Sequence, residues 1–135
     1  MSILDEFNAI MQRLDFAIDD SLNTEVANAV REEMHDKVHE LVYKPYTPKN
    51  PLGRRGDSGG LSSVFNYDAR VGNDHLLIVE NNTPMQNPDG SNLVEIVEEG
   101  KESYKMPFPR PFIKETEESV KAETALMEGL KRNGF

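Results

Sequence analysis

The chain has 135 residues, a formal net charge of -9 and no cysteine. The lack of cysteine excludes disulfides, thiol nucleophiles and cysteine-type zinc sites. Because phosphate backbones repel an acidic surface, the charge argues against broad or sequence-specific nucleic-acid binding. No apolar stretch approaches the roughly 18 residues of a membrane span, and residues 1–10 lack a secretory pattern. We therefore expect one soluble, non-secreted domain over residues 1–135.

Residues 3–43 are expected to be helical. Apolar side chains recur along them at steps of three and four, and neither proline nor glycine interrupts the pattern. The Asp-Asp-Ser sequence at residues 19–21 could cap a second helix, with Glu25 close enough to assist. Two interpretations therefore stay open, one long helix or a pair of helices with a bend.

Two loops are expected to act as extended arms. Three prolines and four glycines exclude regular helix from residues 44–60, and residues 81–92 contain an Asn-Pro-Asp-Gly turn. Between the loops, residues 61–71 read as extended structure, and residues 75–80 read as a buried strand after a turn at Asn73 and Asp74.

The remaining residues predict mainly helix. Residues 93–99 can form one or two helical turns, and an amphipathic helix is expected from Pro111 to near Gly134. The whole pattern indicates an α+β fold. It would combine a long N-terminal helix or helix pair with a small antiparallel sheet and a C-terminal helix.

His35 and His39 are the candidate metal ligands. They stand four residues apart in the expected helix, so they share a face and could hold one zinc ion in a zinc-dependent hydrolase. Asp36 stands where the usual pattern has a longer glutamate base, and the sequence offers no clear third ligand. The favoured interpretation is that both histidines face solvent or a neighbouring subunit, with no catalytic residue, metal or cofactor in the chain.

Two stretches are better candidates for binding a protein partner. Residues 54–61 carry an arginine pair on the first arm, in a region with a local excess of basic residues, and arginine forks suit carboxylates at interfaces. Residues 107–113 place two phenylalanines in a proline-stiffened lead to the last helix. For Phe112, docking of its own helix onto the core is the favoured alternative. The candidate partner-binding residues are Tyr46, Arg54, Arg55, Asp57, Leu61, Phe108 and Arg110.

These stretches, in this order, resemble a known family. The carrying pieces are a Tyr/Pro segment at 45–48, Arg-Arg-Gly to Gly-Gly-Leu at 54–61, Leu-Val-Glu-Ile-Val-Glu-Glu-Gly at 93–100 and Arg-Pro-Phe-Ile at 110–113. Together they resemble neck or tail-completion proteins of siphophages over about residues 20–130. One departure is that Leu52 and Gly53 precede the arginine pair, where the family commonly has an aromatic residue.

The resemblance implies a structural virion protein of a long-tailed bacteriophage. Such a subunit would join head to tail as a homo-oligomeric ring at the head–tail junction, after assembly in the host cytoplasm. Its partners would be other neck, head-completion, and tail-tube or tail-terminator proteins, with DNA passing through the ring. A tail-terminator subunit is an alternative within the same class, because families of similar size share this order of elements.

Overall fold

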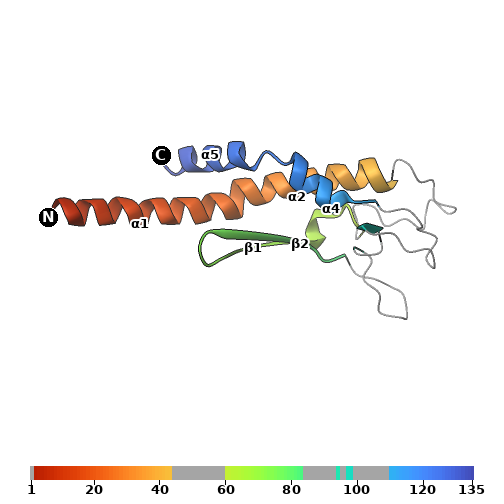
Figure 1. The fold of residues 1–135 in the computed structure, drawn as a ribbon, viewed down its shortest axis with the longest axis horizontal. Helices are drawn as coiled ribbons and strands as arrows, with labels where there is room; N and C mark the ends of the chain where they lie inside the picture. Colours follow the sequence, from red (N-terminus) through yellow and green to blue (C-terminus); the bar gives the residue numbers. More distant parts are fainter. Residues whose placement is uncertain (1, 44–59, 84–93, 95–96, 99–109) are drawn as a thin grey trace. The chain divides into compact units, whose positions relative to one another are not determined.

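The computed structural model describes residues 2–43, 60–83, 94, 97–98 and 110–135 (Figure 1). The chain divides into two compact units. The first, here called the helix-pair unit, contains residues 1–29, 69–78 and 121–135, and the second, the core unit, contains residues 30–68 and 79–120. Each unit has its own packing, described separately below.

The N-terminal segment is one continuous helical run. Helix α1 (Ile3–Ser21) passes through a π-helical turn, Leu22–Val26, into α2 (Ala27–Val38), and a second π-helical turn covers His39–Tyr43. Of the two interpretations left open by the sequence, the structure therefore has the single helix. At its start, the Ser2 hydroxyl accepts a hydrogen bond from the Asp5 backbone N–H at 3.1 Å, and the Asp5 carboxylate accepts one from the Ser2 backbone N–H at 3.2 Å.

The first π-helical turn begins directly after the Asp-Asp-Ser sequence that could have capped a second helix. Ala17, Ser21 and Val26 are all buried. The first two are four residues apart and the last two are five apart, which is the hydrogen-bonding step of a π-helix. The wider turn therefore absorbs one extra residue, and the helix continues where the sequence suggested a possible break.

The sheet is a two-stranded antiparallel hairpin. Strand β1 (Tyr67–Gly72) pairs with β2 (Leu76–Asn81). Asp74 and His75 in the connecting turn have φ values of 60° and 56°, a left-handed conformation that Asp and His adopt more readily than most residues. The extent of the second expected strand is confirmed almost to the residue. The expectation that this strand is buried was wrong, because Leu76 is 56% exposed, the next three residues are half-buried and Asn81 alone in the strand is buried. The first strand is shorter than expected, because residues 60–66 form a turn followed by a 3₁₀ turn, Val64–Asn66.

The C-terminal region forms two helices, so the expectation of one amphipathic helix was wrong. Helix α4 (Phe112–Ser119) ends where Val120 adopts an extended ψ of 134°, and α5 (Ala122–Arg132) follows. In an unbroken helix at about 100° per residue, the buried residues Phe112 and Ala125 would point to opposite sides. The break lets each helix bury its own face, α4 in the core unit and α5 in the helix-pair unit.

The core unit is built around a cluster of apolar side chains. Phe112 is fully buried among them, which confirms that it docks its own helix onto the core. Residues 94, 97 and 98 are helical, in agreement with the expected turns at 93–99. The cluster comprises Met34, Val38, Val42, Leu61, Tyr67, Val94, Val97 and Phe112, with Leu41, Val79 and Ile113 at its edge.

Two polar groups fix the connections of this core. Asn81 is buried and donates from its side-chain nitrogen to the Leu61 carbonyl at 3.1 Å, while its side-chain oxygen accepts from the Thr83 backbone N–H at 3.1 Å. The Glu98 carboxylate accepts from the first backbone N–H groups of α4, those of Ile113 at 2.9 Å and Lys114 at 3.1 Å. A carboxylate at a helix start satisfies donors that would otherwise lack partners and complements the helix dipole.

Candidate interaction surface

Most of the residues predicted to bind a partner lie outside the described residues. This holds for Tyr46, Arg54, Arg55, Asp57 and Phe108, and for nearly all of the two expected arms. Leu61 and Arg110 are the two candidates that the structure describes.

Leu61 and Arg110 both have structural contacts in the core unit. Leu61 is 5% exposed and belongs to the apolar cluster, and its carbonyl accepts from the Tyr67 hydroxyl at 2.5 Å. Arg110 is half-buried, and its backbone N–H donates to the Val97 carbonyl at 2.9 Å just before α4 begins. Leu61 is therefore part of the apolar core, and the backbone of Arg110 fixes the segment that enters α4.

The paired histidines do not assemble a metal centre in the described part of the chain. The ring centroids of His35 and His39 are 4.6 Å apart, and Nδ1 of His35 donates to the Ser62 carbonyl at 2.7 Å. No group of three or more His, Asp or Glu side chains with metal-binding geometry occurs among the described residues. The zinc-hydrolase interpretation needs a third ligand, and these residues do not supply one.

His75 has a different role in the helix-pair unit. Its Nδ1 lies 2.7 Å from the Asp19 carboxylate, and its Nε2 lies 3.4 Å from that of Asp15. The hydrogen bond to Asp19 raises the pKa of His75 above its ordinary value of 6.5, and both carboxylates add to the effect by their charge. This pair connects the hairpin turn to α1.

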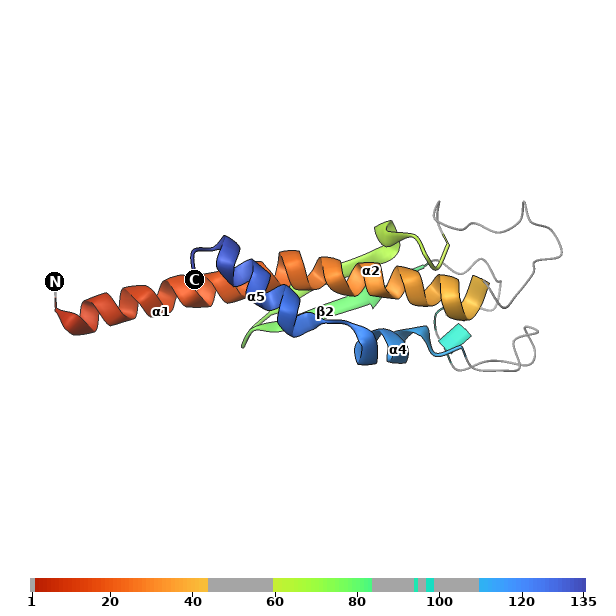
Figure 2. The ribbon, with the colours of Figure 1, turned by 90° about the horizontal axis from the view of Figure 1, so that it is seen from above.

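The second contact of α1 is with α5, and it is unusually close. A Cβ atom at Gly129 would lie only 2.4 Å from the Cβ and Oγ of Ser21. Ala17, Ser21, Ala125 and Gly129 are buried where the helices meet, so small side chains permit the approach. Figure 2 shows α5 lying along the C-terminal part of α1.

A charged cluster closes one side of this helix pair. The Arg132 guanidinium bonds to the carboxylates of Asp20 and Glu25, and the Asn133 side chain donates to Asp20 at 3.1 Å. The hydrogen bonds from Asn133 and then Arg132 lower the pKa of Asp20, and that from Arg132 lowers the pKa of Glu25. All of these charged groups are at least partly exposed, so the cluster orients the helices more than it stabilises them.

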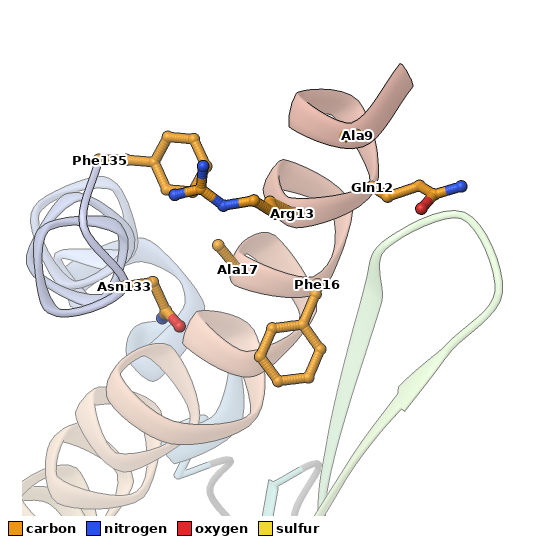
Figure 3. A pocket seen from close by; sticks show the side chains of 7 residues that line it. All are labelled: Ala9, Gln12, Arg13, Phe16, Ala17, Asn133 and Phe135. Carbon is orange, nitrogen blue, oxygen red and sulfur yellow. The ribbon is translucent and has the colours of Figure 1, made fainter. Parts of the chain in front are cut away.

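A groove lies where the chain leaves α5 beside α1. It has a volume of about 440 Å³ and is lined by residues of α1 between Ala9 and Ala17 and by Asn133 and Phe135. Figure 3 shows the Phe135 ring beside the Arg13 side chain, whose guanidinium carbon is 5.6 Å from the ring centroid. Phe16 lines the groove and is 69% exposed.

The N-terminal half of α1 exposes a row of large apolar side chains. Five side chains, Ile3, Leu4, Phe7, Ile10 and Met11, are between 39% and 86% exposed. At about 100° per residue they occupy an arc of about 120° on one side of the helix. We call them the apolar row. The sequence contains their three- and four-residue spacing, but the spacing indicated only a helix and not an uncovered surface.

The fold and its surface thus define an α+β protein with an exposed apolar face on an acidic helix. No helix in the described residues combines the length and hydropathy needed to cross a bilayer. The family model YomN matches residues 6–133, so the chain belongs to the YomN family and is a phage-associated protein. No curated protein and no solved structure matches the chain.

Proposed function

We propose that this chain is a structural subunit of a long-tailed phage virion that joins the head to the tail. In this proposal it is a neck or tail-completion protein that acts as a homo-oligomeric ring and catalyses no reaction. It resides at the head–tail junction of the virion and, during assembly, in the host cytoplasm. Its partners are other neck, head-completion, and tail-tube or tail-terminator proteins.

The observation that carries the proposal is the apolar row. Membership of a phage-associated family sets the context, and the resemblance of residues 20–130 to neck proteins narrows it. A helix that leaves five large apolar side chains open to water is stabilised when another protein covers them. Such a surface suits an assembly subunit, whose work is docking.

The two expected arms supply the timing in this proposal. A segment that orders on binding loses conformational entropy at that moment, so it engages firmly only when a completed partner offers enough contact. Ring contacts repeated around an axis then reinforce one another. The isolated chain is accordingly expected to be monomeric or weakly associated, and sedimentation velocity on the purified protein measures this.

Inactivation of the gene in a phage or prophage that encodes the chain tests the proposed role in head–tail joining. Electron microscopy should then show DNA-filled heads and tails of normal length that remain separate. Restoring the gene from a plasmid should restore joined particles. Tails of uncontrolled length would assign the chain as a tail terminator, and normal infectious particles would refute an assembly role.

The arginine pair of the first arm provides a sharper test. Arg54→Glu combined with Arg55→Glu should leave the helical circular dichroism unchanged and block head–tail joining. A matched control is Lys114→Glu with Lys121→Glu, two exposed positions where the same change of charge should be tolerated. Normal particle yield with both arginines reversed would exclude the arm from the joining step.

A further inference from the structure

The apolar row continues a seam that the chain itself covers farther along α1. Ile3, Ile10, Ala17 and Ser21 follow one side of the helix, and α5 covers the last two of them. Figures 1 and 2 both show α1 continuing past the end of α5. The uncovered part, from Ile3 to Met11, would extend about 14 Å as α-helix.

The covered part of the seam shows what kind of element fits this side of α1. There the neighbour is a helix, and the contact is made by apolar and small side chains along it. Anchors spaced as Ile3, Phe7, Ile10 and Leu14 are the pattern by which helices recognise one another. A second helix laid along the open part would continue the same mode of packing.

Charge decides which helix this can be. Residues 2–20 contain five acids and one base, Arg13. Asp19 and Asp20 are already bonded to His75 and Arg132, whereas Glu6 and Asp15 border the apolar row, and Asp15 keeps 60% of its side chain exposed beside His75. The base, Arg13, already lies over the Phe135 ring. Two copies of α1 placed face to face would bring acidic edges together, and like charges across an interface oppose association. The same acids disfavour an anionic membrane surface.

We propose that the apolar row is the docking site for an amphipathic helix of a different protein, with lysine or arginine bordering its apolar side. Its leucine- or isoleucine-type side chains would cover Phe7 and Ile10, and its cations would lie beside Glu6 and Asp15. The inference deepens the proposed function by giving the chemistry of one assembly partner, and it rests on that function for its biological setting.

The chain offers a matched pair of variants for the test. Phe7 and Phe16 are both exposed on α1, at 57% and 69%, and nine residues place them on opposite sides of the helix. Phe7→Gln removes a central anchor of the apolar row, whereas Phe16→Gln makes the same chemical change on the other side. Ile10→Gln is a second variant within the row, and circular dichroism checks that all three stay folded.

The probes are two synthetic amphipathic peptides of about 20 residues. Both carry the same apolar positions, with lysine at the bordering positions of one and glutamate in the other. Fluorescence anisotropy with the full chain should show binding of the lysine peptide. Phe7→Gln and Ile10→Gln should weaken it by about tenfold and Phe16→Gln should not. The glutamate peptide should bind at least about tenfold more weakly to the unchanged chain.

Four results would overturn the inference. Equal binding of the lysine peptide to all variants would show attraction by bulk charge, and equal binding of both peptides would remove charge as the selector. A dimer of the unchanged chain that Phe7→Gln abolishes would make a second copy the occupant. Loss of head–tail joining on gene inactivation, with peptide binding absent, would sink this inference and leave the proposed function standing. Peptide binding together with normal particles after gene inactivation would refute the proposed function and leave the docking site standing.

Discussion

Replacing Gly129 with alanine tests the close approach of α5 to α1 through the sign of its effect. In a helix interior, Gly→Ala on its own stabilises by about 1 kcal/mol, because glycine has the greater backbone freedom to lose. Here the added methyl would lie 2.4 Å from Ser21 Cβ and 2.6 Å from a Glu25 carboxylate oxygen. Carbon atoms pack best at about 3.5–4.0 Å, so the overlap with Ser21 exceeds about 1 Å.

Relief of that overlap requires the helices to move. Ser21 is fully buried and its hydroxyl is bonded to the Ala17 carbonyl at 2.6 Å, so its side chain has little room to turn away. Overpacking of this kind costs about 1–3 kcal/mol. Set against the helix-propensity gain of about 1 kcal/mol, Gly129→Ala should bring no gain in stability and should lower the free energy of unfolding by up to about 2 kcal/mol.

Urea denaturation followed by circular dichroism measures the change, and two further variants isolate its cause. Glu128→Ala puts alanine at an exposed position of α5 and should have little effect. Ser21→Gly removes the atoms that the new methyl meets, so in combination with Gly129→Ala the loss should be smaller than the sum of the two. A stability gain of about 1 kcal/mol from Gly129→Ala alone would refute the close helix contact.

Three other changes probe the remaining contacts. Asn81→Ala should lower the free energy of unfolding by about 2–3 kcal/mol in urea melts, because it leaves the buried backbone N–H of Thr83 unpaired. The control Asn82→Ala, at the exposed neighbouring position, should have little effect. Equal losses from the two variants would contradict the role of the Asn81 hydrogen bonds. Glu98→Ala should cost about 1–2 kcal/mol by removing the cap of α4, and Glu98→Asp, too short to hold both N–H groups, should recover only part of it; no loss with alanine would contradict the cap. His75 has a raised pKa, so its bond to Asp19 contributes fully below pH 6.5 and is lost as the pH rises through the raised value. An NMR titration should show this pKa return toward 6.5 in Asp19→Asn, and an unchanged pKa would argue against the bond.

The regular elements could be predicted because their sequence signals are local. Uninterrupted three- and four-residue spacing predicted helix over residues 3–43, and the run before Glu80 predicted the second strand. The α+β class followed from the order of these elements. The spacing of apolar residues could not show that Ser21 leads into a π-helical turn. The Asp-Asp-Ser sequence is compatible both with the cap of a new helix and with a helix that continues.

The features that the sequence did not indicate depend on contacts between distant residues. The break between α4 and α5 lies at Val120 and Lys121, where the sequence has neither proline nor glycine. It becomes visible only in the structure, where Phe112 and Ala125 are buried on separate helix faces. The apolar row has the same spacing as a buried stripe, and its exposure becomes visible only in the structure, where α5 ends at Arg132. All seven predicted partner-binding residues, on the first arm and before the last helices, stay predictions.

The serine and aspartate at the start of α1 have a consequence for how fast and how tightly that helix can be recognised. Their reciprocal hydrogen bonds hold the first turn in place. The Ser2 hydroxyl lowers the pKa of Asp5, so the carboxylate stays ionised, and keeps these bonds, further into acid than a free aspartate would. The five side chains of the apolar row therefore project from a helix that is formed before a partner binds. A partner that binds this end of the molecule therefore contacts a helix that is already formed, and binding loses little conformational entropy in α1.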